Sequence, residues 1–163
     1  MILSPKIFLD ECIAHPIAAR LLHYYTPAYP SLKVRHLFEE YRAKRCDSVW
    51  VPNLAEQGGW IIITKDRGKH SSQGKSGKPR LPDLCIEYKI TCVAISNKLG
   101  HAKAAEIQEA IDEAMRNIQA IYAAPAGTIV KLGIEYTKGD IKHYSLRVGN
   151  VSLGSFLTSS QSN

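Results

Sequence analysis

Short apolar runs and longer apolar stripes alternate along the chain, which predicts strands and helices in turn. Two runs are continuous and rich in β-branched residues, namely Trp60 to Thr64 and Thr91 to Ile95, and a shorter apolar run covers Ile7 to Leu9. Continuous runs of this kind are typical of strands buried on both faces of a parallel sheet. We expect Trp60 to Thr64 to be the central strand.

Helical signals lie between these runs. Pro16 stands at the first position of a predicted helix that ends near Tyr25, because proline is favoured there. Asp47 is expected to cap a helix from Ser48 to Gln57, in which Pro52 is tolerable only near the start. The Gly58-Gly59 pair would end this helix by supplying positive φ.

The segment from Leu32 to Phe38 could be a strand or could begin a helix that continues through Arg45, and we favour the strand. A short helix is predicted over Pro82 to Tyr88. The clearest helix covers 102–122, where apolar residues recur at steps of four and three. These residues are Ile107, Ile111, Ala114, Ile118 and Ile121.

The last patterned segment alternates apolar and polar residues on both sides of the Lys138-Gly139-Asp140 turn, which predicts a carboxyl-terminal β-hairpin. The succession of elements indicates an α/β fold with a mainly parallel central sheet. We expect a single domain over 1–150 with a mobile basic loop at 67–80, and a flexible tail over 151–163.

Composition narrows the classes of protein that fit. The chain has 163 residues, of which 45% are hydrophobic and 22% charged, as in an ordinary globular protein. It contains neither an apolar run long enough for a membrane span nor a secretory signal, so we expect a cytoplasmic protein without membrane contact. A net charge of +6 favours a polyanionic partner. The four cysteines lack metal-binding spacing and are interpreted as buried free thiols, and the six scattered histidines as surface or satisfied core residues.

Carboxylates stand at or beside the ends of two apolar runs. Asp10 follows the first run, Asp66 follows the central one, and Asp47 begins the helix that leads into it. Each acid alone could be a cap or a turn residue. If the two strands are parallel neighbours, however, all three would project toward one sheet edge, where open α/β sheets bind ligands.

Carboxylates that lie close together repel, so proteins tolerate such clusters mainly when a cation occupies them. An oxygen-only ligand set favours Mg²⁺ or Mn²⁺ over zinc. Such ions can activate water and orient a phosphodiester, so the acids predict metal-dependent hydrolysis at phosphorus.

A family resemblance rests on three segments: Leu9-Asp10-Glu11, Asp47-Ser48-Val49-Trp50-Val51-Pro52, and Gly59-Trp60-Ile61-Ile62-Ile63-Thr64-Lys65-Asp66. Over residues 6–67 the chain resembles the PIN-like domain family, in particular the compact branch related to VapC-type toxins of bacterial toxin–antitoxin systems. The resemblance implies a PIN-like three-layer fold and RNA cleavage. It also implies that Asp10, Asp47 and Asp66 are the metal ligands, and that Thr64 is the hydroxyl residue of the Thr-x-Asp motif.

Members of this family carry a further glutamate on a helical hairpin, and here the stretch between Asp10 and Asp47 is short. Glu11, Glu39 and Glu40 are the candidates, and we favour Glu11 as a fourth catalytic acid because it lies beside Asp10. The resemblance also implies RNA, a cognate antitoxin protein and a second copy of the chain as partners.

Basic residues gather directly after the proposed metal site. Flexible cations there would suit the backbone of a nucleic acid, although a solvated loop is an equal alternative. With Thr64, the candidate nucleic-acid-binding residues are Lys65, Arg67, Lys69, Lys75, Lys78 and Arg80.

Two alternatives to a nuclease remain open. A catalytically inactive relative could bind RNA or a protein through the same basic surface. A phosphatase could use Asp10 as a nucleophile, but such enzymes need an acid two residues later, where this chain has Cys12.

Overall fold

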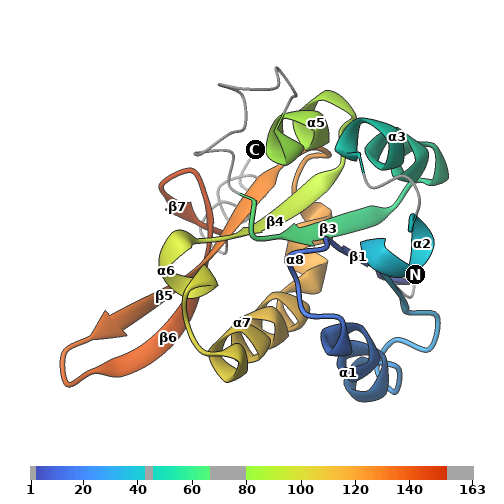
Figure 1. Cartoon of the computed structure of the whole chain (residues 1–163). Coiled ribbons are helices and arrows are strands. Elements are labelled where there is room, and N and C mark those ends of the chain that lie inside the picture. The colour runs from blue at the N-terminus through green and yellow to red at the C-terminus, as the bar shows by residue number, and fades with distance from the viewer. Residues whose placement is uncertain (1–2, 43–45, 67–79, 154–163) are drawn as a thin grey trace.

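Seven strands form one mixed sheet with helices packed on both faces (Figure 1). The computed structural model describes residues 3–42, 46–66 and 80–153. The strand order is β2-β1-β3-β4-β5-β6-β7; the first five strands in this order are parallel, and β6 and β7 are added antiparallel. The strands are β1 (Lys6–Leu9), β2 (Lys33–His36), β3 (Trp60–Thr64), β4 (Thr91–Ile95), β5 (Ile129–Thr137), β6 (Ile141–Val148) and β7 (Val151–Ser152).

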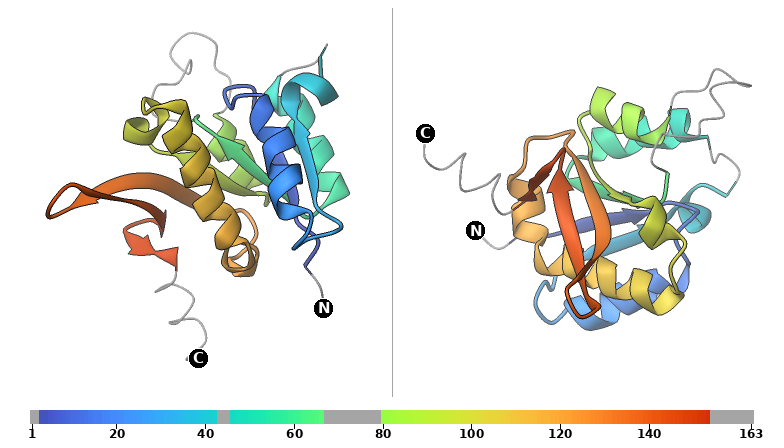
Figure 2. Two further views of the ribbon diagram at one scale, coloured as in Figure 1. Left: turned by 90° about the horizontal axis from the view of Figure 1, so that it is seen from below. Right: turned by 90° about the vertical axis from the view of Figure 1, so that its left-hand side faces the viewer.

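The helices make the two outer layers of a three-layer α/β fold (Figure 2). Helices α1, α7 and α8 cover one face of the sheet, and α3 and α5 cover the other, whereas α2 and α6 are single turns. The helices are α1 (Pro16–Tyr25), α2 (Leu37–Glu40), α3 (Asp47–Gln57), α5 (Leu81–Glu87), α6 (Asn97–Gly100), α7 (Ala104–Arg116) and α8 (Ile118–Ala123).

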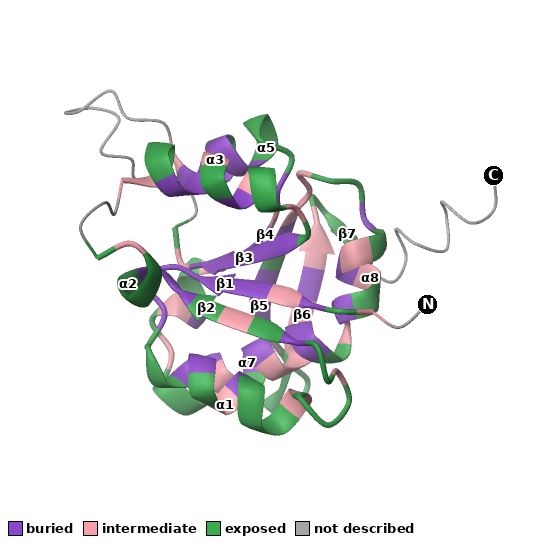
Figure 3. Cartoon of the chain, turned by 90° about the vertical axis from the view of Figure 1, so that its right-hand side faces the viewer, coloured by how far each residue is buried: buried purple, intermediate pink, exposed green. Residues whose placement is uncertain are grey.

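Alternation along the buried strands divides the core into two clusters, one on each face of the sheet (Figure 3). Ile61 and Ile63 pack with α1, α7 and α8, whereas Phe8 and Ile62 pack with α3 and α5. Successive strand residues point to opposite faces, and both faces are covered, so every residue of β3 is buried.

Several predicted elements are confirmed. The predicted bounds of α1 and β4 match the structure, β3 lies inside the sheet between β1 and β4, and β5 and β6 form the predicted hairpin. Gly139 and Asp140 both have positive φ in the hairpin turn, which glycine and aspartate accept more readily than bulky residues. Among the described residues, no helix is long and apolar enough to cross a membrane.

The predicted helix over 102–122 is two helices rather than one. Helix α7 ends at Arg116, and α8 begins at Ile118. The Asn117 side chain donates to the Glu113 carbonyl oxygen at 2.8 Å and to the Glu113 carboxylate at 3.0 Å. Asparagine interrupts the helix because its side chain competes with the backbone for such carbonyls.

Three further boundaries differ from the prediction. The segment 32–38 is a four-residue strand, β2, that passes directly into the short helix α2. Val151 and Ser152, placed in the predicted tail, form β7 against β6. Pro52 lies in the second turn of α3 rather than near its start. Residues 67–79 of the predicted basic loop and residues 154–163 of the predicted tail lie outside the described part of the chain.

Candidate functional site

The carboxyl ends of β1 and β3 bring Asp10 and Thr64 side by side. The two strands are parallel neighbours with Leu9 opposite Ile63, and the Asp10 N–H donates to the Ile63 carbonyl oxygen at 3.1 Å. This bond extends the strand alternation by one residue. Asp10 and Thr64 therefore point to the face of the sheet that α3 covers.

Asp10 is buried, with 6% of its surface exposed, and both of its carboxylate oxygens accept hydrogen bonds. Oδ1 accepts from the Glu11 N–H at 2.7 Å, and Oδ2 accepts from the Thr64 hydroxyl at 2.6 Å. The Cys12 thiol also donates to Oδ2, at 3.3 Å. These three hydrogen bonds from described residues fix the Asp10 carboxylate at the strand ends.

Cys12 belongs to this network, which the sequence did not indicate. Although much of the residue is exposed, its Sγ faces Asp10 and accepts from the Lys65 N–H at 3.1 Å. Burial of the sulfur, together with the charge of Asp10, raises the pKa of the Cys12 thiol to about 11. The expectation of buried thiols holds for Cys85 and Cys92, whereas Cys12 is exposed and Cys46 half-buried.

Asp47 is the first residue of α3 and not its cap, because Cys46 occupies the cap position. Its Oδ1 accepts from Trp50 Nε1 at 3.1 Å. Burial, together with the charges of Asp10, Asp66 and Glu11, raises the pKa of Asp47 to about 6. Four acids thus share one electrostatic environment at this edge.

Glu11 and Asp66 lie just past their strands, in segments where strand alternation no longer applies. The Asp66 N–H donates to the Thr64 hydroxyl oxygen at 2.9 Å, so Thr64 connects Asp66 to Asp10. The two other candidates for a fourth acid pair elsewhere: Glu39 with His15 and Glu40 with Arg35. Of the three candidate glutamates, Glu11 is therefore the one whose charge raises the pKa of Asp47.

The donor chemistry of this edge fits a hard divalent cation, because the predicted ligands Asp10, Asp47 and Asp66 are all carboxylates. The charges of Asp10, Asp66 and Glu11 all act on Asp47. Within residues 3–42, 46–66 and 80–153, no three acids, histidines or cysteines lie close enough together to hold an ion in the arrangement described.

Two of the predicted nucleic-acid-binding cations are described. Lys65 directly follows β3, and its backbone is bonded to Cys12. Arg80 occupies the N-cap position of α5, which covers the same face of the sheet as α3. The other four, Arg67, Lys69, Lys75 and Lys78, lie outside the described residues.

Comparison with known families agrees with this geometry. Residues 5–72 match a family model described as a PIN like domain. The match covers the amino-terminal part of the chain that supplies β1, β3 and α3. Neither the curated proteins nor the solved structures gave a match.

Proposed function

We propose that the protein is a ribonuclease that depends on Mg²⁺ or Mn²⁺ and hydrolyses RNA phosphodiesters at the carboxyl edge of β1 and β3. The observation that carries this proposal is the Thr64–Asp10 hydrogen bond across these two strands. It fixes a buried carboxylate beside three further acids, in the segment that matches the PIN-like family. A nuclease-type fold with clustered acids suits phosphodiester hydrolysis.

Each residue of the edge has a part in this proposal. Asp10, Asp47 and Asp66 would hold the ion, which when bound supplies a Lewis acid for water activation and charge neutralisation. Thr64 holds the Asp10 carboxylate in place through Oδ2. The raised pKa of Asp47, about 6 without an ion, means that its carboxyl group must release its proton to bind the ion. Lys65 and Arg80 would contact the RNA backbone.

The test is incubation of a mixed RNA pool with the full chain in Mn²⁺, in Mg²⁺ and in EDTA. We expect cleavage with a divalent ion, none in EDTA, and none from Asp66→Asn. Asp140→Asn serves as the matched control because Asp140 is exposed in the hairpin turn. Metal-dependent cleavage that survives Asp66→Asn would refute the assignment of the site.

A more specific form of the proposal is that the nuclease is the toxin of a toxin–antitoxin pair. Its support is the resemblance of residues 6–67 to the VapC-related branch. Expression should then arrest growth, and Asp10→Asn should abolish the arrest. A neighbouring small reading frame whose product binds the chain would be the antitoxin.

A second candidate function is an RNA-binding module without catalysis. The observation that favours it is the hydrogen bonding of Asp10, whose carboxylate already accepts three hydrogen bonds. In that case Asp10 would act as a structural acceptor at the strand ends. RNA binding without cleavage in any divalent ion would support this alternative.

A further inference from the structure

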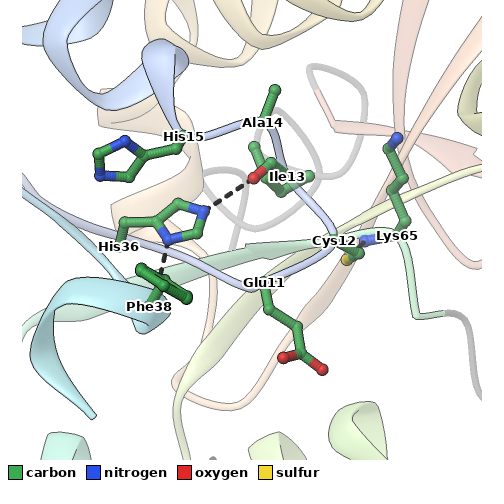
Figure 4. Close-up of a pocket in the computed structure, with 8 residues that line it drawn as sticks. All are labelled: Glu11, Cys12, Ile13, Ala14, His15, His36, Phe38 and Lys65. Atoms are coloured by element: carbon green, nitrogen blue, oxygen red, sulfur yellow. Dashed lines mark hydrogen bonds between the residues drawn. The ribbon is translucent and has the colours of Figure 1, made fainter. Parts of the chain in front are cut away.

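The carboxyl edge of β1 and β3, with Asp10, Glu11, Asp47 and Asp66, is called the acid edge below. A pocket opens beside it, between the turn after β1 and the start of α2 (Figure 4). Its lining includes Cys12, His15, His36, Phe38 and Lys65. Cys12 belongs to both places, because it lines the pocket while its thiol donates to Asp10 Oδ2 at 3.3 Å. One side chain and one hydrogen bond therefore separate the pocket from the buried carboxylate.

His36 makes the pocket rigid. Its ring is buried, its Nδ1 accepts from the Phe38 N–H at 3.1 Å, and its Nε2 lies 2.8 Å from the Ile13 carbonyl oxygen (Figure 4). An acceptor at Nδ1 and a donor at Nε2 define one neutral tautomer with both nitrogens engaged. His36 thus ties the turn after β1 to the start of α2, without offering a nitrogen to a ligand.

The rim, in contrast, carries exposed rings. Phe38 is 44% exposed and lines the pocket. The His15 ring lies edge-on against His36 at 5.1 Å between centroids, and its Nε2 is 2.7 Å from Glu39. The Arg42 guanidinium lies 5.6 Å from the centre of the Phe38 ring.

We propose that this pocket binds one unpaired nucleobase of RNA, next to the phosphodiester held at the acid edge. Exposed aromatic rings flanked by Arg42 and Lys65 suit a flat base joined to a charged backbone, because bases stack on rings while phosphates pair with cations. The ring of Phe38 supplies the stacking surface, and His15 supplies a polar contact at the rim. This inference rests on the proposed function for the position of the scissile bond.

The experiment measures binding of a fluorescent, unstructured oligoribonucleotide by anisotropy in Ca²⁺. Phe38→Leu keeps an apolar side chain but removes the ring, and Phe38→Trp restores one. We expect Phe38→Leu to weaken binding roughly 5- to 150-fold, the range for loss of one base–aromatic stack, and Phe38→Trp to bind like wild type. Tyr24→Leu is the control, since Tyr24 is 62% exposed near the other end of α1.

A second arm replaces each nucleotide in turn by an abasic one. One position should lose affinity by the same factor as Phe38→Leu, and the two changes together should lose no more than either alone. Additive losses at every position would overturn the base pocket, as would equal affinity of Phe38→Leu and wild type.

A cleavage assay of the wild type in Mn²⁺ distinguishes failure of the base pocket from failure of the proposed nuclease. If the wild type cleaves and Phe38→Leu binds and cleaves equally well, the base pocket fails and the nuclease stands. If the wild type binds RNA through Phe38 but never cleaves, the nuclease fails and base binding stands. Binding of a protein but of no RNA would overturn the pocket assignment.

Discussion

Replacement of Asp47 by asparagine should stabilise the fold near neutral pH. The amide is uncharged, and its oxygen can still accept from Trp50 Nε1, as the Asp47 oxygen does at 3.1 Å. What the substitution removes is a charge that burial and the neighbouring acids Asp10, Asp66 and Glu11 disfavour. These effects raise the pKa of Asp47 from 3.8 to about 6.

The sign of the stability change follows from proton binding. The folded protein holds the Asp47 proton more tightly than the unfolded chain, so the fold gains stability as the pH falls from about 6 toward 3.8. A rise in pKa of this size corresponds to roughly 3 kcal/mol. Asp47 is only partly buried, so solvent screening reduces this to about 1–2 kcal/mol. Loss of a favourable charge in the first turn of α3 offsets about 0.5 kcal/mol.

The assay is urea unfolding in EDTA, followed by the fluorescence of Trp50 and Trp60. We expect Asp47→Asn to be more stable than the wild type by about 1 kcal/mol at pH 7.5, and the difference to shrink at pH 4.5. Asp140→Asn, in the hairpin turn, should change little at either pH. An Asp47→Asn variant that is less stable than wild type at pH 7.5 would refute the reasoning.

Three further predictions concern the same edge. Thr64→Val keeps the shape of a fully buried side chain but removes the hydroxyl that bonds Asp10 and Asp66, so it should destabilise the fold by about 2 kcal/mol in urea unfolding; an unchanged midpoint would contradict the network. Mn²⁺ at a hundred times its dissociation constant should stabilise the wild type by about 2.7 kcal/mol and leave Asp66→Asn unchanged in thermal unfolding; equal shifts would place the ion elsewhere. The pKa of Cys12 is about 11, so little of its thiol is ionised at pH 8. Its alkylation at pH 8, measured by mass spectrometry, should be on the order of a hundredfold slower than that of an ordinary thiol. Rapid alkylation would show that the sulfur does not face Asp10.

The hydrophobic pattern was sufficient to predict the sheet interior. The runs Trp60–Thr64 and Thr91–Ile95 became neighbouring buried strands, since a continuous apolar run has few other places in an α/β fold. The break at Asn117 could not be predicted from the stripe, because Ala114 before it and Ile118 after it are both buried. The competition that ends α7 comes from one side chain and leaves the periodicity intact.

At the site, the sequence placed acids at strand ends but could not give the direction of each side chain. Asp10 and Thr64 point the same way because β1 and β3 are parallel and in register. The orientation of Cys12 depends instead on the turn after β1, which brings its sulfur back to Asp10. The pocket at Phe38 and His36 lies between the turn after β1 and the start of α2. These two segments are far apart in the sequence and meet only in the folded chain.

The most direct test of the central proposal is the single-turnover cleavage rate of an unstructured oligoribonucleotide in Mn²⁺. The wild type should cut the RNA, whereas Asp10→Asn and Asp66→Asn should each be at least about a hundredfold slower, because each removes a charge that would hold the ion. Asp140→Asn should cut at the wild-type rate. If both site variants cut as fast as the wild type, or if the wild type does not cut in any divalent ion, the proposed nuclease site at the carboxyl edge of β1 and β3 is wrong.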